Sequence, residues 1–479
     1  MIPAEILPYI PLIILVAQVI AFLLIGTFIL KTFFGAKSYI IASMLRSEKI
    51  VSVFDKFVPF KTFFNFISDA GLIIGFGTVA LDSLYFYKYK RTLRIVLNAF
   101  SFIIFFVLAF LFFNPFSGNS MVPGFDPLIL ATILAFSFAL FGISGFMLVT
   151  LAVNALDIIQ KILLGVRACP GVAPLIPGVR IPGVPFFVPE HGWISLFIIL
   201  VIHEGFHGVL ARISKINVKS AGLLLAGLLP IGAFVEPDEK QLNKLPDKEQ
   251  LRIFSAGASA NIFTGFVFML IALLLFSLVL APAINDLNEI RKESIDSVII
   301  GDVSEKIEFC GNTFEASAFG NIDINSQIIS INKIKINETR DAMTVLASDR
   351  FKGIEIELIT PAGEDKNVSL EPNEIGSYGF SIEEKTKPDY SFPEDYEQKA
   401  ALISLGQSFF AWLIILSFLL GLVNFLPVSF FDGGRISTIF LKNYFFTKKK
   451  VEERKKVLAK SLLILTIILL ILNALPLFI

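Results

Sequence analysis

Eight stretches of this chain are long and apolar enough to cross a lipid bilayer. A helix of about 20 apolar residues spans the roughly 30 Å of hydrocarbon in a membrane. Mean hydropathy is +0.74, and charged residues make up only 17% of the chain, fewer than a soluble protein of this length carries. The sequence therefore predicts a polytopic α-helical membrane protein with about eight spans. The expected spans are 10–32, 68–87, 96–114, 127–153, 192–212, 253–281, 402–426 and 459–478.

Changes in composition divide the chain into four regions. We expect an N-terminal transmembrane region at 1–166, and its first apolar stretch is a retained span because it lacks a small-residue cleavage site. Residues 167–284 and 399–479 would form the two parts of a membrane core, with a polar domain inserted between them at 285–398. Residues 167–191 are rich in proline and glycine, which predicts an ordered loop at the membrane surface.

A short apolar segment, Ala221 to Val235, follows the fifth expected span. It is too short for a helical span, and residues that interrupt helices divide it further. These features favour a re-entrant or interfacial β-hairpin. The interrupting residues are Gly222, Gly227, Pro230 and Gly232.

The inserted region contains short strand-like runs and one helical pattern, Arg340 to Ala347. This mixture predicts a small β-rich domain. The run EASAFGNIDINSQIISINKIKI, followed by a helix and two strands, resembles a PDZ domain, although Asn325 and Ser326 replace the glycine usual before the second strand. The resemblance implies a peptide ligand, and a β-rich domain of another kind is the alternative. The strand-like runs are Ser297 to Ile300, Gln327 to Ile331, Gly353 to Ile359 and Val368 to Leu370.

Basic residues indicate how the chain is oriented in the membrane. They are concentrated in 439–460 and 212–219, and such loops face the cytosol. The two assignments agree because the spans 253–281 and 402–426 lie between them, so the inserted domain and the C-terminus face outward. The loop after 68–87 does not fit, because its basic residues would lie outside; either one N-terminal span is miscounted or this loop breaks the rule. These residues are Lys88, Lys90, Arg91 and Arg94.

Net charge and cysteine content exclude two classes of function. The formal net charge is zero, so no overall positive field favours a nucleic-acid partner. Cys169 and Cys310 are the only cysteines and lie too far apart for a CxxC motif. A single disulfide between them stays open, and we expect no catalytic role for either.

The run IHEGFHG at 202–208 contains two of the three histidines of the chain. Residues four apart on a helix share one face, so His203 and His207 can reach one metal ion. Glu204 lies between them, where it can take a proton from metal-activated water. Ionisable groups inside an apolar span cost free energy and persist mainly where they face a polar cavity or a metal. We expect the third histidine, His191, to cap the span at the surface.

A zinc site with two histidines lacks a third protein ligand. The candidate is Asp432, in the run NFLPVSFFDGG at 424–434, where an apolar span ends. The two glycines after it allow backbone or substrate to approach closely. Taken alone, Asp-Gly-Gly favours a turn or a helix cap, so the assignment depends on its combination with the histidines.

HExxH in one span and NxxPxxxxDGG in a later one together resemble the site-2 protease family of intramembrane zinc metalloproteases. The run AGASAN at 256–261 is similar to that family's AGPxxN segment, with Ala258 in place of proline, and residues 230–235 are similar to its membrane-associated hairpin. The resemblance covers about 185–440 and includes the PDZ-like insert. It implies one zinc ion with three protein ligands, a catalytic base, and two asparagines that hold or polarise the substrate backbone. His203, His207 and Asp432 would be the ligands and Glu204 the base. The two asparagines would be Asn261 and Asn424.

The resemblance implies an intramembrane zinc metalloendopeptidase that cuts membrane segments of other proteins, in regulated intramembrane proteolysis or in removal of signal-peptide remnants. Its partners would be transmembrane protein substrates and membrane lipid. It would be a multi-pass protein of the cell membrane with its site near the cytosolic side, and the outer insert would screen substrates by size. Three alternatives stay open: a non-catalytic scaffold or receptor that retains the fold, a zincin with a membrane-anchored soluble catalytic domain, and a transporter.

Overall fold

The computed structural model describes residues 10–40, 42–113, 126–181, 183–184, 186–428, 430–445 and 451–478. Seven helical stretches within these residues are long and apolar enough to cross a membrane. They coincide with seven of the expected spans, and α1 (Ile10–Phe34) coincides with the other, in agreement with a polytopic helical protein. Lys448, Lys449 and Lys450 of the expected cytosolic loop lie outside the described residues. The seven stretches are Val58–Phe86, Arg91–Phe113, Pro127–Leu163, Gly192–Ile213, Asp247–Val279, Tyr396–Asn424 and Lys460–Leu477.

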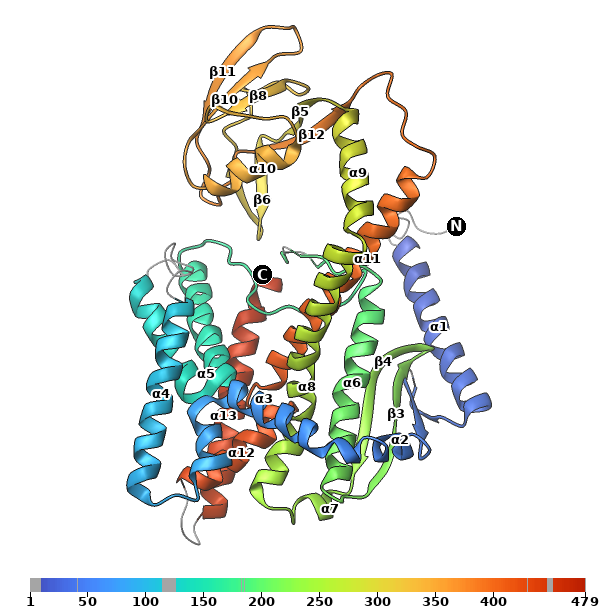
Figure 1. Ribbon diagram of the computed structural model, residues 1–479, viewed down its shortest axis with the longest axis vertical. Helices are drawn as coiled ribbons and strands as arrows, with labels where there is room; N and C mark the ends of the chain where they lie inside the picture. The colour runs from blue at the N-terminus through green and yellow to red at the C-terminus, as the bar shows by residue number, and fades with distance from the viewer. Residues whose placement is uncertain are drawn as a thin grey trace.

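Helix α8 (Asp247–Leu274) lies at the centre of the membrane part. It packs against α3 (Lys61–Leu81), α6 (Gly192–Ile213) and α11 (Tyr396–Asn424). Buried apolar side chains from these helices form one continuous core. Figure 1 shows α1 on one side of this group and α4 (Arg91–Phe113), α5 (Pro127–Leu163) and α13 (Val451–Ala474) on the other. α12 (Asp432–Phe445) precedes α13.

Two helices are interrupted at glycines that lie against each other. Gly77 in α3 has a φ of +56° and Gly142 in α5 has a φ of +58°, a backbone region that favours glycine. A Cβ on Gly142 would lie 2.4 Å from the carbonyl oxygen of Ile74, so the two breaks can pack only without side chains. Thr78 Oγ1 donates to the carbonyl oxygen of Ala139 at 2.8 Å, which satisfies an acceptor beside the break.

The break in α3 turns the chain back toward the side from which it came. Before α3, Asp55 accepts a hydrogen bond from Arg212 Nε at 2.6 Å, at the end of α6. After α3, the carbonyl oxygen of Leu84 accepts from Lys248 Nζ at 3.2 Å, at the start of α8. Both ends of the α3 stretch therefore lie at the end of the bundle opposite the β-rich insert (Figure 1). The basic loop beginning at Lys88 then lies on the same side as Arg212, which removes the conflict with the expected orientation.

The expected hairpin is present and belongs to a larger sheet. β3 (Val218–Ala226) and β4 (Leu229–Pro237) pair antiparallel. β1 (Lys37–Ser38) and β2 (Ala42–Ser47), from the segment after α1, extend the sheet in the order β1-β2-β3-β4. β4 is therefore an edge strand, and it lies beside α6 (Figure 1). Entry of the hairpin into the membrane stays a prediction.

A β-rich unit stands at one end of the membrane helices, between α9 (Ala281–Ser294) and α11 (Figure 1). Its sheet has the order β11-β10-β8-β5-β12, and α10 (Thr339–Ser348) packs against the sheet. The expected strands and helix are confirmed, whereas α9, β12 and the β6–β7 hairpin were not predicted. Its identity as a PDZ domain stays a prediction. The strands are β5 (Ile295–Val303), β6 (Lys306–Phe309), β7 (Asn312–Glu315), β8 (Gln327–Ile331), β9 (Ile334–Lys335), β10 (Ile354–Ile359), β11 (Asp365–Leu370) and β12 (Phe380–Thr386).

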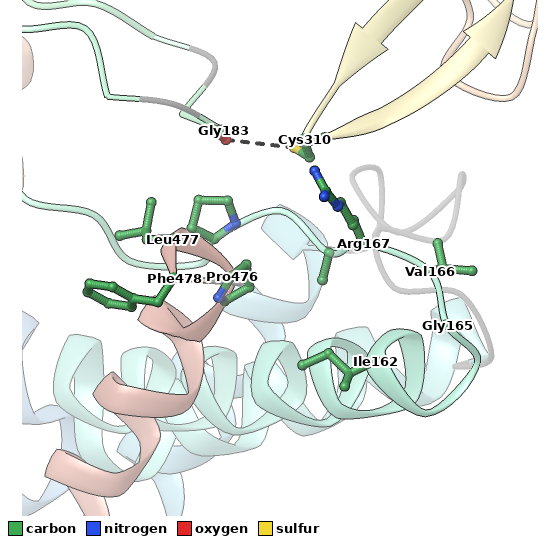
Figure 2. A pocket seen from close by; sticks show the side chains of 12 residues that line it. Ile162, Gly165, Val166, Arg167, Gly183, Cys310, Pro476, Leu477 and Phe478 are labelled. Atoms are coloured by element: carbon green, nitrogen blue, oxygen red, sulfur yellow. Dashed lines mark hydrogen bonds between the residues drawn. The ribbon is translucent and has the colours of Figure 1, made fainter. Parts of the chain in front are cut away.

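The β-rich unit also contacts the loop that follows α5, through a group of residues that we call the clasp. Cys310, at the β6–β7 turn, forms a disulfide with Cys169. Arg167 N donates to Asn312 Oδ1 at 3.1 Å, and Asn312 Nδ2 donates to the carbonyl oxygen of Arg167 at 2.6 Å. A cavity of about 410 Å³ is lined by Arg167 and Cys310 and by residues 476–478 near the C-terminus (Figure 2). We define the clasp as Arg167, Cys169, Cys310 and Asn312. It attaches the unit to the rest of the described chain in addition to α9 and α11.

Candidate metal centre

His203 and His207 lie on one face of α6, as their spacing predicts. α6 is continuous from Gly192 to Ile213 and is apolar over most of its length. The Nε2 atoms of the two imidazoles are 3.3 Å apart. Their side chains are only 7% and 16% exposed. Two nitrogen atoms that face each other inside an apolar bundle require a proton or a cation between them.

Asp432, the first residue of α12, joins the two histidines. Its Oδ2 lies 3.3 Å from His203 Nε2 and 3.2 Å from His207 Nε2. In a tetrahedral zinc site with bonds of about 2.0–2.1 Å, neighbouring ligand atoms are about 3.3–3.4 Å apart. Apart from the two imidazoles, no donor among the described residues reaches Asp432 Oδ2. The three side chains therefore fit a zinc ion in both spacing and chemistry.

Helix α8 forms the wall behind His203. Residues 255–260, with the sequence SAGASA, are all small and all buried. A Cβ on Gly257 would lie 2.3 Å from His203 Nε2, so only glycine leaves room for the ring. The run that resembles AGPxxN therefore lies directly against a candidate ligand, and Ala258 in place of proline leaves α8 helical through this point.

Each imidazole has a partner on α8 at its other ring nitrogen. His207 Nδ1 lies 2.7 Å from the carbonyl oxygen of Ile253, to which it can donate. His203 Nδ1 lies 3.0 Å from the side-chain amide of Asn261, which is fully buried. A proton on Nδ1 leaves Nε2 free, which is the form that binds a metal. For His203 this requires the oxygen of the Asn261 amide to face the ring, an orientation reached by rotating the amide group.

Glu204 lies between the histidines in sequence and contacts the edge strand β4. Its Oε2 accepts a hydrogen bond from the backbone N–H of Val235 at 3.1 Å. In an antiparallel edge strand, alternate N–H groups point away from the sheet, and Val235 uses such a group here. The candidate base, the candidate ligands and the edge strand therefore meet at one place.

The remaining predicted residues have other contacts. Asn424, the last residue of α11, donates from Nδ2 to the carbonyl oxygen of Leu420 in its own helix at 2.9 Å. No hydrogen bond in the described part of the chain links Asn424 to the histidines, so its substrate role and that of Asn261 stay predictions. His191 lies at the other end of α6, with Nε2 3.2 Å from Ser408 Oγ.

Sequence reasoning found the candidate ligands but not the groups that orient them. Ile253 and Val235 act through backbone atoms, which no residue type reveals. Asn261 was singled out for the substrate, whereas in this structure it contacts His203. The one available signal was the run of small residues at 255–260, because such runs predict close helix packing.

A comparison with known families matches the segment that carries this geometry. The model of a family described as Peptidase family M50 matches residues 191–472. The match includes α6, α8, α11 and Asp432, which carry the candidate centre. An uncharacterized protein of Methanocaldococcus jannaschii is 33% identical over 158 residues, which cover 32% of this chain and 40% of that relative.

Proposed function

The chain belongs to peptidase family M50, a family of membrane metalloproteases, and we propose that it is a zinc endopeptidase that cuts other membrane proteins. The bond that it hydrolyses lies in or near a transmembrane segment, as in regulated intramembrane proteolysis or the removal of signal-peptide remnants. The observation that carries the proposal is the meeting of three ligand atoms within 4.8 Å of one another. They come from His203 and His207 on α6 and from Asp432, which lies more than 200 residues later in sequence and is brought beside them by the fold.

The chemistry is divided among a few side chains. A zinc ion held by the three ligands would polarise the scissile carbonyl and make water more acidic. Glu204 follows His203 on α6, where its carboxylate can take a proton from that water and return it to the leaving amine. Asn261 and the carbonyl of Ile253 keep the imidazoles in the orientation that presents Nε2. The buried apolar side chains of the surrounding helices would keep bulk water from most of the site.

The edge strand β4 offers a place for the substrate backbone. A helical membrane segment hides its peptide bonds, so it must unwind before it can be cut. An unwound segment can pair with an edge strand through backbone hydrogen bonds. Because β4 contacts Glu204 at Val235, such pairing would bring peptide bonds of the substrate to the candidate centre.

The disulfide and the basic residues favour one orientation in the cell membrane. Disulfides form in oxidising compartments, so the β-rich unit with Cys310 belongs on the outer side. Arg212 in the last turn of α6, and Lys215 and Lys219 just after it, lie at the other end, which favours the cytosol. The centre would then lie toward the cytosolic side. The outer unit would screen substrates by size, and a PDZ-like unit would bind a peptide at the edge of its sheet.

Replacement of the candidate base tests this proposal. Glu204→Gln keeps the shape of the side chain and removes its basicity, so we expect kcat to fall by about 10²–10⁴-fold. Cleavage is measured on a membrane reporter protein in vesicles, and zinc content by atomic absorption. Glu239→Gln, a change of the same kind in an exposed pair with Arg435, is the control and should retain activity.

Two results would overturn the assignment. Normal cleavage by the Glu204→Gln variant would exclude this carboxylate as the base. A purified chain that binds one zinc ion and cleaves no reporter would favour the non-catalytic scaffold instead.

A further inference from the structure

A buried ion pair joins α3 to the helix that orients both candidate ligands. Arg252 Nε donates to Asp69 Oδ1 at 2.7 Å, and Arg252 Nη2 donates to Oδ2 at 2.6 Å. Tyr85 OH donates to the same carboxylate at 2.8 Å. The side chains of Arg252 and Asp69 are 18% and 7% exposed. A charged pair among apolar helices is costly unless it is well hydrogen-bonded, and here the carboxylate accepts three hydrogen bonds.

The backbone of α8 connects this pair with the centre. The carbonyl oxygen of Arg252 accepts a hydrogen bond from Ser68 Oγ of α3 at 2.7 Å. The next carbonyl, that of Ile253, accepts from His207 Nδ1 at 2.7 Å. Of these two consecutive carbonyl groups, the first is hydrogen-bonded to α3 and the second to a candidate ligand. A shift of this turn away from α3 would therefore carry the acceptor of His207 with it.

Close packing transmits the position of α8 to the other imidazole as well. A Cβ on Gly71 of α3 would lie 2.8 Å from the Cα of Ser259, and one on Gly257 would lie 2.3 Å from His203. α8 is therefore held between α3 and α6 without free space. Asn261, one turn further along α8, contacts His203 Nδ1. The location of α8 sets the acceptors of both imidazoles.

We propose that Asp69 and Arg252 are positioning residues for the metal centre. They act through α8, which they hold where the carbonyl of Ile253 and the side-chain amide of Asn261 meet the Nδ1 atoms of the histidines. The catalytic consequence rests on the function proposed above. The direct consequence is tight zinc binding, which can be measured without any cleavage. The role extends the centre into the N-terminal region, outside the segment 191–472 that matches the family.

A second buried ion pair supplies a matched control. Asp82, which is 1% exposed, accepts a hydrogen bond from Arg94 Nε at 2.6 Å and from Asn98 Nδ2 at 2.8 Å. Arg94 and Asn98 belong to α4, whose main packing partners are α5 and α3. Both pairs join an arginine to a buried aspartate, although Arg94 is 36% exposed and Arg252 is 18% exposed. Arg252 lies on α8, whereas Arg94 lies on α4.

The experiment compares zinc affinities of the full-length protein in detergent micelles, by competition with a fluorescent chelator. Asp69→Asn and Arg252→Gln are expected to lower zinc affinity by about 10–100-fold, as loss of outer hydrogen-bond partners does at other metal sites. Asp82→Asn should stay within about two-fold of the unchanged protein, even where its thermal stability falls. Arg252→Lys keeps the charge but not the paired bonds, so its zinc affinity should fall less than that of Arg252→Gln.

Equal zinc affinities in Asp69→Asn and Asp82→Asn, whether both normal or both reduced, would overturn the proposal. If these variants do not fold, the zinc affinities of Arg252→Lys and Arg94→Lys are compared instead, and equal values would again overturn the proposal. In variants that keep some activity, kcat should fall more than KM rises, because substrate binding is not touched. If the zinc affinities follow the predicted order but the protein has no peptidase activity, the proposed function is refuted and the positioning role of Asp69 and Arg252 is not.

Discussion

The metal centre and the β-rich unit are joined to the rest of the protein in different ways. At the centre, helices from distant parts of the chain pack with no spare room, as Gly257 does against His203. The β-rich unit is carried by α9 and α11 and touches the loop after α5 through the clasp. A closely packed site cannot accommodate added volume. A unit that is joined through two helices and a few side-chain bonds can lose one of these bonds and stay folded. Small changes of shape should therefore disable the centre, while loss of the clasp should leave it intact.

The largest effect is expected from one methyl group at the centre. In Gly257→Ala the new Cβ would lie 2.3 Å from His203 Nε2, so either the ring or α8 must shift. A displacement of about 1 Å at a reacting group can lower the rate by about 10²-fold. We expect at least this loss in kcat/KM together with weaker zinc binding. The measurements are reporter cleavage and chelator competition on the same preparation.

Gly406→Ala is the matched control for this substitution. Gly406 lies in α11, where the nearest atom to an added Cβ is Phe276 Cζ at 3.6 Å, an ordinary contact. Alanine is favoured over glycine inside a helix by about 0.5–1 kcal/mol, so stability should not fall. A similar loss of activity in both variants would show that the bundle as a whole, and not the contact with His203, is sensitive to added volume.

The second effect concerns the outer unit. Substitution of both clasp cysteines, Cys169→Ser with Cys310→Ser, removes a disulfide between residues 141 apart in sequence. Such a link typically contributes about 2–4 kcal/mol by restricting the unfolded chain. We expect the outer unit to be cleaved faster by an added protease, while hydrolysis of a reporter without an outer domain stays unchanged. Reductant should reproduce the effect in the unchanged protein and have none on the double variant. A loss of reporter cleavage as large as that in Gly257→Ala would contradict the comparison.

Features that depend on local sequence were predictable. Continuous apolar runs predicted the long helices, and helical spacing predicted that His203 and His207 share a face. Short strand-like runs predicted β8 and β10. Asp432 could be proposed only from its combination with the histidines, because Asp-Gly-Gly alone is typical of a turn.

Features defined by distant partners were not predictable. β2 is a strand because β3 pairs with it from far along the chain, and β1 in turn pairs with β2. The two residues of β1 carry no pattern of their own. The turn in α3 was missed because apolar residues continue on both sides of Gly77. For that reason the loop at Lys88 conflicted with the expected orientation. The ion pair of Asp69 and Arg252 was also missed, since neither residue stands in a motif.

The smallest effect is expected from the hydrogen bonds of the clasp. Asn312→Ala removes the two bonds with the backbone of Arg167, which lie at an exposed site, and leaves the disulfide in place. A hydrogen bond of this kind contributes about 0.5–1.5 kcal/mol, so the outer unit should become only slightly more sensitive to protease. The unchanged protein and the double cysteine variant give the two limits of the protease assay. If Asn312→Ala exposed the unit as much as loss of the disulfide, the backbone bonds would be the main attachment. The disulfide would then only retain a contact that already forms without it.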